Sequence, residues 1–273
     1  MFLSSKDIEG CSSRTLKYYR DIISKFIEYI DKLLSKVTTD DIRIYLSHYK
    51  EISNCSAVTM DNIRRVFSSF FAWLEDEDYI LKSPVRRIHK VKTATVVKET
   101  LSDENIERLR DGCTHIRELV IIELLISTGM RIGELVNLDI SDIDFEDRSC
   151  VVLGKGNKQR EVYFDARTKI HLKQYLNSRK DNETALFISK IKPYHRISIS
   201  SVESIIRNLG KKLNIQRVHP HKFRRTMATM AIDKGMPIEQ VQKLLGHTKI
   251  DTTMHYAMVN QANVKYSHRK YMS

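Results

Sequence analysis

The chain has 273 residues, of which 41% are hydrophobic, so it can bury the cores of two domains of ordinary size. Its 46 Lys and Arg residues against 34 acidic ones suit an extended polyanion, first of all nucleic acid, although an ordinary basic protein has the same balance. Four separated cysteines without a C-x-x-C pair argue against a disulfide framework or zinc ribbon. With no signal-peptide pattern and no apolar run near 18 residues, we expect a cytoplasmic protein without membrane contact.

The first 90 residues predict a small helical bundle. Apolar residues recur at three- and four-residue steps over 13–34 and 56–75, as on one face of a helix. Between them, Thr38 or Thr39 begins a short helix with an acidic first turn, which suits the helix dipole. We therefore predict a helical domain over residues 1–90, with its first helix beginning near residue 13.

A basic stretch with little amphipathic order follows at 83–100. We predict a linker at 91–100 and a second domain over 101–273. A solvated run of charges is the other interpretation of this stretch.

The second domain is predicted to be mainly helical with a small sheet. A helix begins at Ser102, with Asn105 in place of the usual Glu of a capping box, and ends at Gly112. The next segment is apolar nearly all round up to Gly129, which indicates a buried helix. The apolar period then shortens, and helical periodicity returns after residue 165. Strand-like runs that predict an antiparallel sheet with a glycine-rich hairpin occupy 138–145, 149–154 and 160–164.

Polar side chains interrupt the apolar pattern of the C-terminal third. His221, Arg224, His247 and Tyr256 lie in segments otherwise built from core residues, and such groups resist burial unless they are paired. Arg224 follows His221 by three positions, so on a helix both heads project from one face and can hold one anion. A surface His/Arg pair has the same spacing, so this pattern alone leaves both interpretations open.

Arg131 and Lys155 occupy turns where a cation can meet an anion. Arg131 comes directly after a glycine turn and before an amphipathic segment, near a helix N-terminus that favours anions. Glu134, one turn further on, could hold its guanidinium, or the two could form an ordinary surface salt bridge. Lys155 lies at the tip of the predicted hairpin, as a mobile ammonium group or as a simple exposed lysine.

Five segments, STGMRIGEL, LGKGNKQREV, HPHKFRRTMAT, LLGHTKIDTT and HYAMV, together and in this order resemble the tyrosine recombinase family, which includes Xer-type recombinases and phage or transposon integrases. They lie within residues 100–260, and the N-terminal bundle is similar to the family's core-binding domain. The resemblance implies a mainly α fold with a small antiparallel β-sheet: a helical, SAM-like core-binding bundle followed by an α+β catalytic domain.

The resemblance also implies a role for each residue of the motifs. It makes Tyr256 the nucleophile that forms a 3′-phosphotyrosyl link to DNA, with Lys155 as the acid for the leaving oxygen and His221 as the base. It implies no cofactor and no metal, and the sequence contains no G-x-x-x-x-G-K-[ST] loop. The complete set of implied catalytic residues is Arg131, Lys155, His221, Arg224, His247 and Tyr256.

The chain departs from the family pattern at Arg225, where many relatives have histidine, and at the Ala257-Met258 pair. Neither change removes a catalytic group. Three other tyrosines, at positions 163, 194 and 266, are rival nucleophiles by composition, but none has the family's spacing from an LLGH segment.

By the same resemblance, the partners are double-stranded DNA and further copies of the chain, as a homotetramer on synapsed sites. The segment after Tyr256 would then dock on a neighbouring protomer, whereas a frayed tail is the alternative. Phosphate contacts would dominate DNA affinity. Candidate DNA contacts are Arg86, Arg87, Lys90, Lys92, Lys158 and Arg225.

Three other functions remain alternatives at this point: a type IB topoisomerase, a non-catalytic DNA-binding regulator of the same fold, and an RNA-binding protein. For an RNA-binding protein, the sequence offers no aromatic stacking motif on a strand. The expected start of the first helix near residue 13 leaves no room for an arm-binding domain before it, which favours a simple Xer-like or mobile-element enzyme. The outcome could be integration, excision, inversion or dimer resolution.

Overall fold

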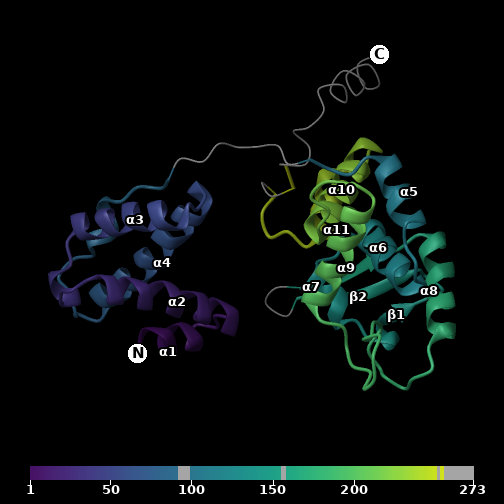
Figure 1. Cartoon of the computed structure of the whole chain (residues 1–273), viewed down its shortest axis with the longest axis horizontal. Coiled ribbons are helices and arrows are strands. Elements are labelled where there is room, and N and C mark those ends of the chain that lie inside the picture. The colour runs from purple at the N-terminus through teal and green to yellow at the C-terminus, as the bar shows by residue number, and fades with distance from the viewer. Residues whose placement is uncertain (92–98, 155–157, 251–252, 255–273) are drawn as a thin grey trace, which may run out of the picture. The chain divides into compact units, whose positions relative to one another are not determined.

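The computed structural model describes residues 1–91, 99–154, 158–250 and 253–254, and the chain divides into two compact units, Met1–Val96 and Val97–Ser273 (Figure 1). The division falls within the segment 91–100 that the sequence predicts as a linker. Among the described residues, none of the helices combines the length and the apolar character that a membrane span requires.

The first unit is a helical bundle around an aromatic core. Phe26, Phe67 and Phe71 are fully buried in it, and the ring centroids of Phe26 and Phe67 lie 4.9 Å apart. Thr38 begins α3 through a capping box with Asp41, as each side chain accepts a hydrogen bond from the other's backbone amide. The elements are α1 (Phe2–Ile8), α2 (Ser13–Tyr29), η1 (Leu34–Lys36, a 3-10 turn), α3 (Thr39–Ser53), α4 (Ala57–Asp76) and η2 (Pro84–Arg87).

The structure corrects two of the predicted boundaries in this unit. A helix, α1, precedes the one expected to come first, and its Phe2 ring packs against the rings of Tyr19, Phe70 and Trp73. These partners are distant in sequence, so local periodicity could not reveal this helix. The next helix, α2, ends at Tyr29 and not near residue 34, because Ile30 has an extended backbone.

The beginning of the predicted basic stretch is part of the first unit. Val85 in η2 is buried, the Thr39 hydroxyl donates to the carbonyl of Pro84 at 2.8 Å, and the Val91 amide donates to Asp61 at 3.3 Å. Residues 83–91 are therefore held against the bundle, within the helical domain predicted for residues 1–90.

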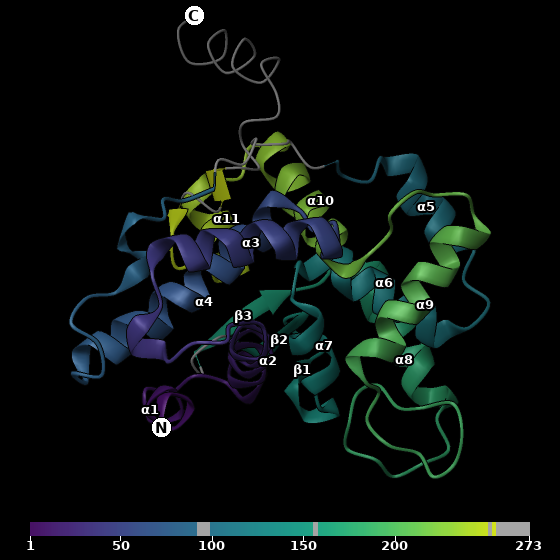
Figure 2. The same cartoon turned by 60° about the vertical axis from the view of Figure 1, so that its left-hand side comes forward.

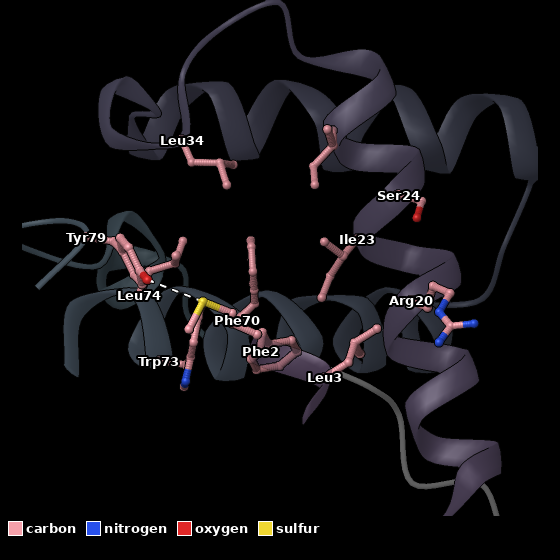
Figure 3. A pocket seen from close by; sticks show the side chains of 12 residues that line it. Phe2, Leu3, Arg20, Ile23, Ser24, Leu34, Phe70, Trp73, Leu74 and Tyr79 are labelled. Atoms are coloured by element: carbon pink, nitrogen blue, oxygen red, sulfur yellow. Dashed lines mark hydrogen bonds between the residues drawn. The ribbon is translucent and has the colours of Figure 1, made fainter. Parts of the chain in front are cut away.

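An apolar pocket of about 440 Å³ lies beside α1 in the first unit (Figure 3). Phe2, Leu3 and Ile23 line it together with Trp73, and the Tyr79 hydroxyl donates a long hydrogen bond, 3.7 Å, to the Met1 sulfur. The short helix α1 thus covers the aromatic core only in part.

The second unit is built around α6, which is apolar on nearly all sides and packs against α5, α8, α9 and α10 (Figure 2). A three-stranded antiparallel sheet, in the order β1-β2-β3, lies beside it, with Val151 of β2 opposite Glu161 of β3. The mainly α fold with a small antiparallel sheet is confirmed. The elements are α5 (Asp103–Asp111), α6 (Ile116–Thr128), α7 (Ile132–Asn137), η3 (Ile140–Asp142), β1 (Ile143–Asp144), β2 (Ser149–Leu153), β3 (Gln159–Tyr163), α8 (Ala166–Ser178), α9 (Ile199–Lys212), α10 (Pro220–Asp233) and α11 (Ile238–Leu245).

The first strand is much shorter than the prediction for 138–145. Asp139 and Asp142 form a capping box that begins the 3-10 turn η3, and only Ile143 and Asp144 pair with β2. Alternating apolar and acidic residues fit a strand, but the aspartate side chains satisfy the backbone locally and form a turn instead.

Candidate active site

Arg131 lies at the junction of α6 and α7. Helix α6 ends at Gly129, whose φ of +62° is a left-handed conformation that favours glycine, and Arg131 is the N-cap residue of α7. The Arg131 guanidinium donates to Glu134 Oε1 at 2.9 Å, and its backbone amide donates to Oε2 at 2.7 Å. Glu134 is only 6% exposed, so this pair is not an ordinary surface salt bridge.

Glu134 also binds a second arginine, which the sequence analysis did not single out. Arg160, on β3, donates from Nη1 and Nη2 to the two oxygens of Glu134 at 2.8 and 2.7 Å. Burial would by itself raise the pKa of Glu134, but the hydrogen bonds from Arg160 and Arg131 outweigh it and leave this pKa below its ordinary value. Glu134 is therefore an anion held between two cations.

Three guanidinium groups meet at the C-terminal end of α11. The successive carbonyls at 244, 245 and 246 accept hydrogen bonds from Arg160 at 2.8 Å, Arg224 at 2.5 Å and Arg131 at 3.4 Å, in that order. The last carbonyls of a helix have no partners within the helix and carry the negative end of its dipole, so cations are favoured there. This helix end brings Arg131 and Arg224, from distant parts of the sequence, to the segment that precedes His247.

The two residues of the H-x-x-R pattern are both on α10 but differ in burial. Arg224 is 3% exposed, and besides its contact with α11 it donates to the carbonyl of Gly129 at 2.7 Å. His221, near the start of α10, is exposed. Arg224 is thus fixed against both the end of α6 and the end of α11, one turn away from a more accessible histidine.

His247 follows α11 directly and is held on two sides. Its Nδ1 lies 2.9 Å from the hydroxyl of Thr253, and its backbone carbonyl accepts from the side-chain Nε2 of Gln242 at 3.0 Å. Burial, together with the charges of Arg224, Arg131 and Arg160, lowers the pKa of His247 to about 4. Its ring is therefore neutral at neutral pH. When the Thr253 hydroxyl donates its hydrogen bond to Nδ1, the ring proton lies on Nε2, which is then a donor.

The sequence analysis missed Thr253, because a threonine within a motif carries no local signal of a contact with His247.

Lys155 and Tyr256, and also Lys92, lie outside the described residues, so their predicted roles stay predictions. The flanking residues locate the hairpin: the Gly154 amide donates to the Lys158 carbonyl at 2.8 Å. A Cβ atom added at Gly154 would lie 3.5 Å from Nη1 of Arg160. The hairpin segment that leads to Lys155 therefore starts beside the arginine and glutamate network.

The predicted DNA contacts differ in their surroundings. Arg86, Arg87, Lys90 and Lys158 are all exposed, and Arg86 is also paired with Glu75 at 2.5 Å. Arg225 is half-buried and donates to the carbonyl of Glu99 at 3.1 Å.

Of the rival tyrosines, Tyr163 is exposed and donates to Glu161 at 2.8 Å, which raises its pKa and opposes ionisation. The Tyr194 ring has the Lys192 ammonium 5.9 Å from its centroid, and Tyr266 lies outside the described residues.

Comparisons with known proteins place this site in a family. The model of the phage integrase family matches residues 99–263, and the model of the phage integrase N-terminal SAM-like domain matches residues 1–81. The tyrosine recombinase XerC of Oceanobacillus iheyensis is 30% identical over 280 residues, which cover 96% of this chain and 91% of that protein. The tyrosine recombinase XerA of Pyrococcus furiosus is 30% identical over 268 residues, with 97% and 90% covered.

Solved structures agree with these sequence matches. A crystal structure of XerA recombinase has a TM-score of 0.58 and 28% identity, covering 100% of this chain and 96% of that one. The Tn1549 transposon integrase, solved in complex with transposon right end DNA, has a TM-score of 0.81 at 20% identity, with 99% and 98% covered. The chain belongs to the phage integrase family and is a tyrosine site-specific recombinase. The topoisomerase and regulator alternatives are not favoured by these relatives.

Proposed function

We propose that the chain cleaves and rejoins double-stranded DNA at specific sites, with Tyr256 as the nucleophile and Arg131, Lys155, His221, Arg224 and His247 around the reacting phosphate. The observation that carries this proposal is the meeting of Arg131 and Arg224 at the end of α11, directly before His247. Tyr256 follows His247 by nine positions and the described Thr253 by three.

The charges suit attack on a phosphodiester. Its anionic oxygens repel a nucleophile, and the pentavalent transition state carries still more negative charge, so cations must already be in place. The guanidinium groups of Arg131 and Arg224 stay charged at any working pH and are fixed by the contacts described above. Although it is neutral, His247 still carries one N–H group, which can donate a further hydrogen bond to a phosphate oxygen.

The remaining residues move protons. The Tyr256 oxygen attacks phosphorus and gives its proton to His221, while the bond from phosphorus to the 5′-oxygen breaks and Lys155 protonates that oxygen. The product is a 3′-phosphotyrosyl link and a free 5′-hydroxyl. Because the link keeps the energy of the broken bond, a 5′-hydroxyl from a partner strand can reverse the step and complete strand exchange without ATP.

The proposed partners are duplex DNA and three further copies of the chain on two synapsed sites. Relatives of this fold have been solved with DNA, including a lambda integrase dimer bound to a COC′ core site and the Tn1549 integrase described above. The proposed DNA contacts are the exposed Arg86, Arg87, Lys90 and Lys158, together with Lys92 and Arg225. An enzyme that acts on chromosomal or mobile DNA in cells like those of its relatives works in the cytoplasm.

The test is covalent capture. Wild-type protein is incubated with fragmented genomic DNA of its source, denatured in detergent, and the attached DNA is sequenced. Capture at a discrete site by wild type and by Tyr163→Phe, but not by Tyr256→Phe, supports the proposal. Equal capture by Tyr256→Phe, or no covalent DNA with binding intact, overturns it. Two duplexes carrying the captured site then separate recombination, which joins them, from topoisomerase action, which only relaxes supercoils.

A further inference from the structure

The contacts of Arg160 connect the parts of the proposed active site. Its Nη1 and Nη2 donate to the two carboxylate oxygens of Glu134, and its Nε donates to the carbonyl of Leu244 at 2.8 Å. The side chain is only 12% exposed. All three of its nitrogen atoms are therefore engaged with groups of the protein, which leaves Arg160 suited to holding other residues and not to gripping a DNA phosphate itself.

Two glycines, Gly246 and Gly154, lie beside this guanidinium. A Cβ atom added at Gly246 would lie 3.0 Å from Cδ of Arg160 and 3.2 Å from its Nε and Nη1. A Cβ atom at Gly154 would lie 3.5 Å from Nη1 of Arg160 and 3.8 Å from Glu134 Oε1. The segment before His247 thus approaches Arg160 more closely than a side chain at Gly246 would normally allow, and the segment before Lys155 lies beside it at ordinary contact distance.

The two groups that Arg160 holds lead to two different catalytic candidates. Glu134 fixes Arg131 through a side-chain and a backbone hydrogen bond, and Leu244 lies in the last turn of α11, three residues before His247. Arg131 and His247 are 116 positions apart in the sequence. Arg160 contacts both the carboxylate that holds the first and the helix end that leads to the second.

We propose that Arg160 is a positioning residue for DNA cleavage, which keeps Arg131 and His247 at the separation that the reacting phosphate requires. This role rests on the proposed function of those two residues. Lysine cannot replace it, because one ammonium group cannot donate along the three directions that a planar guanidinium offers to two carboxylate oxygens and a carbonyl. Lysine does keep the positive charge, so charge and geometry can be separated.

The test compares Arg160→Gln and Arg160→Lys with Arg179→Gln in the full-length protein. Arg179 is a matched control, because its buried guanidinium also binds a carboxylate, Asp181, and backbone carbonyls, those of Glu183, Ala185 and Leu186. The substrate is a duplex that carries the site captured by wild type, nicked beside the cleavage position so that cleavage traps the covalent complex. The measured quantities are the rate of covalent-complex formation, the DNA affinity and the melting temperature.

A misplacement of about 1 Å can cost on the order of 100-fold in rate. We therefore expect Arg160→Gln and Arg160→Lys each to slow covalent-complex formation by roughly 10- to 100-fold at unchanged DNA affinity. Arg179→Gln should keep the wild-type rate at a temperature where all variants are folded. As a second readout, the His247 imidazole pKa, followed by NMR, should rise in Arg160→Gln but stay low in Arg160→Lys, because Arg160 is one of the charges that lower it.

Full cleavage by Arg160→Lys would show that only the charge matters, and full cleavage by Arg160→Gln would show that the residue is dispensable; both overturn the positioning role. An equal loss of rate in Arg179→Gln would show a general effect of destabilisation and would also overturn it. These outcomes all require an active wild-type protein. A wild type that forms no covalent complex on captured or genomic DNA would instead contradict the proposed function.

Discussion

Replacing Glu134 with glutamine removes the negative charge that Arg131 and Arg160 share. In the folded protein this carboxylate is buried and accepts four hydrogen bonds from the two arginines. Glutamine has nearly the same shape, but its NH₂ group would face guanidinium donors. The variant therefore isolates the loss of charge from the loss of volume.

The size of the effect follows from burial. Removing one partner of a buried ion pair costs about 3–5 kcal/mol, because the other charge stays buried without compensation. Since glutamine keeps one accepting oxygen and Arg131 is partly exposed, we expect about 3 kcal/mol. For a unit of this size, each kcal/mol lowers the melting temperature by about 2–4 °C, so the expected decrease is roughly 6–12 °C.

Differential scanning calorimetry at pH 7 measures this decrease, with Glu239→Gln, an exposed carboxylate on α11, as the control. The pKa of Glu134 is depressed in the folded state, so its stabilisation is present above the ordinary pKa of 4.5 and is lost as the pH falls through the folded-state pKa. The two proteins should therefore converge in stability in acid. A decrease no larger than that of the control, or a difference that grows in acid, would refute the reasoning.

His247, Gly246 and Phe67 can each be tested by a single substitution. Folding lowers the pKa of His247 from its ordinary 6.5 to about 4, so its contribution to stability is complete above pH 6.5 and falls by on the order of 3 kcal/mol as the pH drops from 6.5 to below 4. Urea unfolding should therefore show a weaker acid dependence in His247→Gln. Gly246→Ala should reduce the stability and the cleavage rate more than Gly235→Ala does. Both glycines have a positive φ, which costs alanine about 1–2 kcal/mol, but of the two only Gly246 faces a neighbouring side chain. Equal effects of the two substitutions in the same unfolding and cleavage assays would contradict this. Phe67→Ala should destabilise the first unit by about 3–5 kcal/mol in urea unfolding, because the ring is fully buried, and a loss below about 1 kcal/mol would mean that the core closes over the gap.

Much of the architecture could be predicted from the sequence because the signals are local. Apolar steps of three and four residues predicted α2 and α4, and the shorter period over 149–164 predicted the β2–β3 hairpin. The catalytic motifs could be identified without the structure, since their order and spacing resemble one family. Local signals failed where distant contacts decide, as in α1, whose Phe2 packs on rings of α2 and α4.

The sequence by itself determined the family and the identities of the candidate catalytic residues, because motif spacing is a property of the chain alone. Only the tertiary structure decided how Arg131 and Arg224 are held, since their partners at the end of α11 lie 115 and 21 positions away. The role of Arg160 belongs to the same level. On a predicted strand it is one more alternating polar residue, and it becomes a link between Glu134 and Leu244 only when β3, α7 and α11 meet. Burial of charge needs partners from several segments, and those partners are brought together only by folding.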